Sequence, residues 1–164
     1  MEKIPKVHIE MITEKTMDCD IQPLSSPALA AEFGRFLYYE GNENEIRTPT
    51  REIVTVCCIT AKGKVLAVDC AFVGTATSSI IGMREIFMSA IMCNAAEIIC
   101  YHNHPSGDPS PSVADNLMTE KIKKAGAIMD IPLRDHIILG EQGYYSYEEK
   151  GVSEWRDSRY EKAG

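Results

Sequence analysis

Residues 96–102, which read "AEIICYH", are apolar at nearly every position and end in a histidine. A strand with one solvated face alternates between apolar and polar residues, and this run does not. We therefore expect a central strand that is buried on both faces. Such a strand needs helices above and below its sheet, so a layered α/β fold with a mixed sheet is the expected class.

Four further segments carry strand patterns. Residues 51–76 contain two β-branched runs around Lys62–Gly63, which predicts a hairpin. Residues 6–14 alternate at Val7, Ile9 and Met11. Residues 131–140 and 144–149 predict two late strands, which gives the central strand enough partners for a sheet.

Three segments carry helical patterns. Residues 25–41 offer Ser26 as N-cap, Pro27 at the first position and Gly41 after the last turn. The other two helices are expected at 83–95 and 112–125, the latter closed by Gly126. Their expected apolar faces are Ile86, Phe87, Ala90 and Ile91 in the first, and Leu117, Met118, Ile122 and Ala125 in the second.

The composition predicts a single soluble domain. The chain has 164 residues, 24 acidic against 17 basic ones, and a net charge of -7. We expect residues 1–50 to belong to the same domain as a core at 51–152, with a polar tail at 153–164. Nucleic-acid binders usually carry a basic face, so we expect DNA binding to be weak at most.

The cysteines and the hydropathy favour the cytoplasm. None of the six cysteines forms a C-x-x-C pair, and the pattern is typical of free buried thiols in a reducing compartment. The first residues have no long apolar core, so we expect no signal peptide. No apolar stretch approaches about 18 residues, so we expect no membrane span.

Two histidines and an aspartate follow the central strand. His102 and His104 are two apart, so both side chains point the same way at the strand end. The loop "PSGDPSP" then turns the chain, Ser112 opens the next helix, and Asp115 sits in its first turn. Two imidazoles and one carboxylate predict a three-ligand zinc site that leaves a fourth position for water.

Other interpretations of this stretch explain less. Ser112 and Asp115 also fit a capping box, which needs no metal, but a capping box does not explain two histidines on one face. The letters His-Asn-His at 102–104 do not build the nuclease site of that name, which is spread over a longer segment. A zinc deaminase needs H-x-E and P-C-x-x-C elements, and neither is present.

The spacing resembles that of the JAMM (MPN-type) metalloprotease-like domains. His102-x-His104, ten residues and Asp115, with Ser112 inside HP-x6-S-x2-D, match their metal-binding pattern. The strings "HNHPSGDPSPS", "DHIILG" at 135–140 and "MREIFMSAIMCNAAEII" at 83–99 resemble the RadC branch. The likeness runs from about residue 1 to 151, is most specific at 102–115, and implies a JAMM/MPN (cytidine-deaminase-like) fold. RadC-type proteins also carry a helix-hairpin-helix region, for which this chain is too short, so we expect a short stand-alone form.

This resemblance implies an enzyme. His102, His104 and Asp115 would bind Zn²⁺, and Ser112 would hydrogen-bond the tetrahedral intermediate. JAMM enzymes use a glutamate near the start of the first hairpin as general base, which corresponds to Glu52, with Glu85 as a rival. The implied reaction is hydrolysis of an amide or isopeptide bond in a protein or peptide of unknown identity.

Some alternatives stay open at this point. His136 lies in an expected strand beside Asp135, and only one of the two can face the site, as a supporting or purely structural residue. Asp108 fits a turn as well as a catalytic role. The competing function is a non-catalytic JAMM/MPN scaffold or an accessory protein in DNA repair or recombination. The oligomeric state has no sequence signal.

Overall fold

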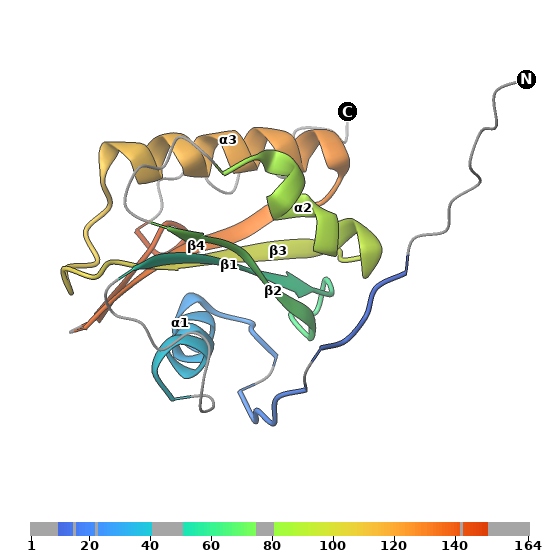
Figure 1. Cartoon of the computed structure of the whole chain (residues 1–164), viewed down its shortest axis with the longest axis horizontal. Helices are drawn as coiled ribbons and strands as arrows, with labels where there is room; N and C mark the ends of the chain where they lie inside the picture. The colour runs from blue at the N-terminus through green and yellow to red at the C-terminus, as the bar shows by residue number, and fades with distance from the viewer. Residues whose placement is uncertain are drawn as a thin grey trace, which may run out of the picture.

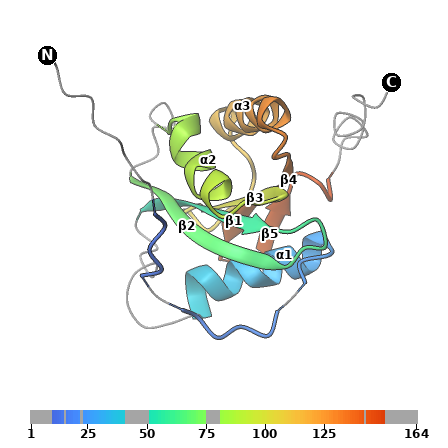
Figure 2. The same cartoon turned by 90° about the vertical axis from the view of Figure 1, so that its right-hand side faces the viewer.

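The computed structural model describes residues 10–14, 16–21, 23–40, 51–74, 81–141 and 143–150. These residues form one five-stranded sheet in the order β2-β1-β3-β4-β5. Helix α1 covers one face of the sheet, and α2 and α3 cover the other (Figures 1 and 2). The strands are β1 (Glu52–Ile59), β2 (Val65–Gly74), β3 (Glu97–Asn103), β4 (Leu133–Gly140) and β5 (Gly143–Ser146). The helices are α1 (Pro27–Arg35), which a short π-helix (Phe36–Glu40) continues, α2 (Met83–Met92) and α3 (Val113–Met129).

The sheet is mixed, as the sequence predicts. β1 pairs antiparallel with both β2 and β3, and β4 pairs antiparallel with β5. β3 and β4 are parallel, and α3 provides the crossover that a parallel pair requires. The hairpin turn at Lys62–Gly63 is confirmed, with Gly63 at a φ of 80°. The central strand β3 lies in the middle of this order and is buried on both faces.

The alternation along β3 divides the core into two layers. Ile98 and Cys100 pack with α2 and α3, whereas Ile99 and Tyr101 pack with α1. The same alternation sends His102 toward the α3 side and the next residue toward the α1 side. The end of this one strand therefore delivers side chains to both faces of the sheet.

The N-cap of α1 is confirmed, because Ser26 accepts a hydrogen bond from the Leu29 amide and Pro27 is the first helical residue. The prediction that Gly126 ends α3 is wrong, since the helix continues to Met129 and ends at Asp130 in the left-handed conformation. A Cβ at position 126 would lie 2.6 Å from the Ile131 carbonyl oxygen. Position 126 therefore needs a glycine, because the backbone at Ile131 passes too close for a side chain.

Two predicted core positions are wrong. Ile91 of α2 is 57% exposed and Leu117 of α3 is 68% exposed. Each helix packs a narrower face on the sheet than the apolar pattern indicates, through residues such as Phe87 and Ile122. Met11 is exposed in a segment without helix or strand, and the rest of the strand expected at 6–14 lies partly outside the described residues.

The six cysteines are free, as expected, but burial holds only for Cys57, Cys58 and Cys100, while Cys70 is exposed. Within the described ranges, no helix has both the length and the apolar character needed to cross a bilayer. Gly41 and the expected tail at 153–164 lie outside the described residues.

Candidate metal centre

The two histidines and the aspartate predicted as ligands lie together at the end of β3. The Nε2 atoms of His102 and His104 are 3.0 Å apart. The Asp115 carboxylate places Oδ1 3.2 Å from the first and Oδ2 3.4 Å from the second. One ligand atom from each residue falls within 4.8 Å of the others, so the three could hold one metal ion.

These separations suit a zinc ion. Zinc binds imidazole nitrogen and carboxylate oxygen at about 2.0–2.2 Å in tetrahedral geometry, which sets ligand atoms about 3.3 Å apart. The observed separations of 3.0 to 3.4 Å lie close to that value. Two nitrogens and one oxygen also leave room for a fourth ligand, as in catalytic rather than structural zinc sites.

The loop between β3 and α3 is held against the turn between β4 and β5. The His104 amide donates to the Leu139 carbonyl at 2.9 Å, and the Glu141 amide donates to the Gly107 carbonyl at 3.0 Å. A Cβ at Gly140 would collide with the Gly107 carbonyl and would lie 2.7 Å from Cδ of Pro109. This close approach fixes where the loop leaves the sheet.

The orientation of His104 is set by a backbone carbonyl. Its Nδ1 lies 2.7 Å from the Asp108 carbonyl oxygen, which can only accept, so Nδ1 carries a proton. In the neutral ring, Nε2 then presents its lone pair to the cluster. The Asp108 carboxylate instead accepts from the Ser110 amide at 2.9 Å, so this side chain forms a turn and only its carbonyl supports the site.

Ser112 and Asp115 form the capping box that the sequence allowed. The Asp115 amide donates to Ser112 Oγ at 3.2 Å, and the Ser112 amide donates to Asp115 Oδ2 at 2.7 Å. Ser112 Oγ also donates to the same Oδ2 at 2.6 Å. The cap therefore holds the carboxylate in place for the two histidines, and the capping and ligand interpretations are compatible.

Contacts within the cluster shift the pKa of two of its three residues, His104 and Asp115. The hydrogen bond to Asp115 raises the pKa of His104, and this outweighs partial burial; the Asp108 carbonyl and the charges of Asp115 and Glu52 add to the rise. Burial would raise the pKa of Asp115, but its close contacts with the two histidine rings and the hydrogen bonds from Ser112 outweigh burial and hold this pKa well below its ordinary value. A cation between these groups is therefore favoured, whether a proton or a metal.

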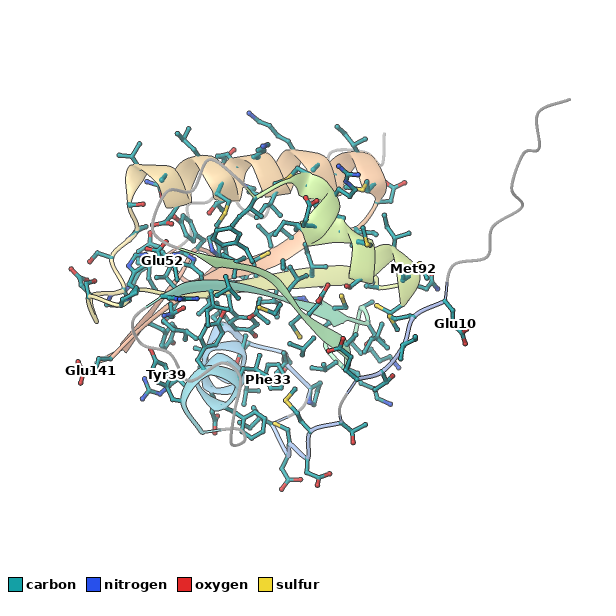
Figure 3. All side chains as sticks on the ribbon, in the orientation of Figure 1. Glu10, Phe33, Tyr39, Glu52, Met92 and Glu141 are labelled. Carbon is teal, nitrogen blue, oxygen red and sulfur yellow. The ribbon has the colours of Figure 1, made fainter. Side chains whose placement is uncertain are left out.

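The two candidate glutamates lie in different places. Val54 pairs with His102 at the end of the β1–β3 ladder, and continuing this register by two residues would set Glu52 opposite His104. The charge of Glu52 acts on the His104 ring. Figure 3 shows Glu52 at the end of the sheet from which the loop to α3 leaves. Glu85 is exposed in the first turn of α2, where it pairs with Arg84 at 3.7 Å. Of the two candidate glutamates, Glu52 is therefore the one whose charge acts on the cluster.

His136 of β4 lies behind His102. It is fully buried, and its Nε2 is 2.8 Å from His102 Nδ1. Its Nδ1 is 2.6 Å from Oγ1 of Thr119, a residue of α3 that the sequence analysis did not single out. Burial lowers the pKa of His136 well below its ordinary value. Asp135 faces the α1 side, so only His136 points toward the cluster, as the strand alternation required.

Asn103 is a second residue that the sequence analysis missed. Its Oδ1 accepts from the Ile53 amide at 2.9 Å, and its Nδ2 donates to the Arg51 carbonyl at 2.9 Å. The side-chain amide thus bridges the backbone on both sides of Glu52. Helical spacing from Asp115 could have indicated Thr119, but no local signal indicates the Asn103 bridge.

Comparisons with known proteins agree with this site. The sequence profile of the RadC-like JAB domain family matches residues 34–152. A UPF0758 protein of Thermotoga maritima is 46% identical over 101 residues, which are 62% of this chain and 46% of that protein. A UPF0758 protein of Clostridium botulinum (strain Loch Maree) is 42% identical over 129 residues, which are 70% of this chain and 57% of that protein.

The chain thus spans about half the length of the curated relatives it matches. The profile match covers the described sheet, α2, α3 and all three cluster residues. It also extends over well more than half of the sequence. The chain belongs to the RadC-like JAB domain family.

Proposed function

We propose that this chain is a zinc-dependent hydrolase of amide bonds, a metallopeptidase or isopeptidase. The observation that carries the proposal is the convergence of His102, His104 and Asp115 at a buried strand end. Imidazole and carboxylate ligands suit zinc, and three of them leave a position open for chemistry. Zinc, when bound, supplies a Lewis acid and lowers the pKa of its water to about 7.

The residues around the cluster have separate roles in this reaction. Glu52 accepts a proton from water as the water oxygen adds to the amide carbon, and delivers that proton to the leaving nitrogen as the C–N bond breaks. The products are a carboxylate and an amine. Ser112 donates to the carbonyl oxygen as it gains negative charge. Its hydroxyl now donates to Asp115, so it turns away from that carboxylate to serve the substrate.

Metal analysis tests the proposal first. We expect about one zinc per chain, lost in His104→Ala and Asp115→Ala because each removes one of only three ligands. Asp108→Asn is the matched control, since that carboxylate bonds within its own loop and zinc should remain. Absence of zinc by elemental analysis, both as purified without chelators and after reconstitution, would overturn the proposal.

The substrate is then sought in cells. Proteins that accumulate with Glu52→Gln but not with wild type are candidate substrates, and the purified protein should cleave them. If the chain is instead a non-catalytic scaffold or a DNA-repair accessory, no proteins should accumulate with Glu52→Gln. A DNA-repair accessory should in addition bind duplex DNA tightly. The net charge of -7 argues against the latter, so we expect only weak, salt-sensitive binding. A sub-micromolar affinity for duplex DNA at physiological salt would favour the alternative.

A further inference from the structure

A buried chain of hydrogen bonds runs behind His102, on the side away from the cluster. It links the Asp115 carbonyl, the Thr119 hydroxyl, the His136 ring and His102 Nδ1. We propose that Thr119 and His136 are positioning residues that keep the proton of His102 on Nδ1 and so leave Nε2 free to bind metal. This inference rests on the proposed zinc site, but the direction of the chain can be measured without metal.

Thr119 has a hydroxyl with one proton to donate. That proton points to the Asp115 carbonyl oxygen at 2.6 Å, and a carbonyl can only accept. The Thr119 oxygen can then act only as an acceptor toward His136 Nδ1, which lies 2.6 Å away. Nδ1 of His136 must therefore carry a proton.

The surroundings of His136 favour a neutral ring. The ring has no exposed surface, and its two hydrogen-bond partners, Thr119 and His102, are not carboxylates. One ring face stacks on Tyr147, with centroids 5.2 Å apart and planes within 5°. The Tyr147 hydroxyl donates to Asn116 Oδ1 at 2.7 Å. The cost of burying a charge on this enclosed imidazole outweighs the attraction of the nearby Asp115 carboxylate, so the ring stays neutral.

His102 is the last ring in this chain of hydrogen bonds. A neutral His136 with a proton on Nδ1 has a lone pair on Nε2, which accepts from His102 Nδ1 at 2.8 Å. A neutral His102 with its proton on Nδ1 has a lone pair on Nε2, the atom that faces His104 and Asp115. His104 also holds a proton on Nδ1, through the Asp108 carbonyl, so Nε2 is again the nitrogen that faces the cluster. Different hydrogen-bond partners thus hold the Nδ1 protons of the two rings, and in both rings Nε2 is the atom directed at the cluster.

Nitrogen-15 NMR of the histidine rings tests this chain directly. In the metal-free protein at mildly alkaline pH, the hydrogen-bond directions place protons on Nδ1 of both His102 and His136. A proton on Nε2 of His102 would mean that the chain runs the other way, and would overturn the proposal. This readout needs neither zinc nor a substrate.

A pair of substitutions tests the consequence for metal binding. Thr119→Val keeps the size of the side chain but removes the acceptor for His136, whereas Thr119→Ser keeps it. We expect zinc affinity to fall about 10–100-fold in the valine variant, the usual cost of losing such a partner, and to recover in the serine variant. Competition with a chelator measures both.

Equal zinc affinity in the two variants would overturn the role of Thr119. A uniform loss in both would indicate a packing defect and would also count against it. If wild-type protein binds no zinc at all, the proposed function fails, and the NMR result still decides the tautomer of His102.

Discussion

Protons and zinc compete for the same nitrogen of His104, and this predicts how zinc affinity varies with pH. Its Nε2 faces Asp115 Oδ2 at 3.4 Å, and this contact raises the pKa of the ring above the ordinary value of 6.5. The bound state needs the neutral ring, so zinc binding releases a proton whenever His104 is protonated. Apparent affinity is then level above the raised pKa and falls as the pH drops through it.

The size of the effect follows from one proton. Each pH unit below the raised pKa lowers the fraction of neutral His104 about tenfold, so His104 alone lowers the apparent affinity about tenfold per unit. The fall should begin above pH 6.5, because the pKa is raised. Asp115 adds no step there, since its pKa lies far below this range.

Competition with a chromophoric chelator of known pH dependence measures zinc affinity at each pH. Glu52→Gln and Glu85→Gln serve as test variant and matched control. The charge of Glu52 contributes to the raised pKa, so Glu52→Gln should keep zinc but move the midpoint down by a fraction of a pH unit. Glu85→Gln should leave the midpoint unchanged, because that carboxylate pairs with Arg84. A level affinity from pH 6 to 8 would refute the reasoning, as would a midpoint that only Glu85→Gln moves.

Three further outcomes are expected. Glu52→Gln should lower turnover of an identified substrate by about 10²–10⁴-fold while zinc stays bound, and Glu85→Gln should not; the reverse result would move the base to Glu85. Ser112→Ala should lower the free energy of unfolding of the metal-free protein by about 0.5–2 kcal/mol in urea titrations, because α3 loses its cap; no change would show that the cap is not needed. Gly140→Ala should weaken zinc binding by displacing the loop at Gly107, whereas Gly143→Ala, with open space around it, should not; equal affinities would contradict this placement of the loop.

The sequence predicted that His102, His104 and Asp115 lie together, and two local patterns carry that prediction. Strand alternation sends His102 and His104 to the same face, and helix capping places Asp115 in the first turn of α3. Alternation and capping set the directions of these side chains locally, whereas the loop that joins them is positioned by contacts with Leu139 and Gly140 of β4. The mixed sheet also followed from local patterns, since its central strand is apolar on both faces and its hairpin has a clear turn.

The missed features depend on contacts between distant segments. Thr119 and His136 meet only because β4 pairs parallel with β3 beneath α3, and no local pattern specifies which strand lies there. The same reason explains Gly126, which resembles a helix stop in sequence but is needed where Ile131 returns. The exposure of Leu117 likewise depends on how far the sheet extends under α3.

The middle residue of the three at 102–104 connects the two parts of the candidate site. Asn103 lies between the two predicted ligands and had no predicted role of its own, yet the three side chains alternate between the faces of the sheet. Both histidines face α3 and Asp115, whereas the Asn103 amide bonds to the backbone at Arg51 and Ile53, on either side of Glu52. The strand end that presents two ligands therefore also fixes the start of β1. The Asn103 amide therefore ties the position of Glu52 to that of the two histidines.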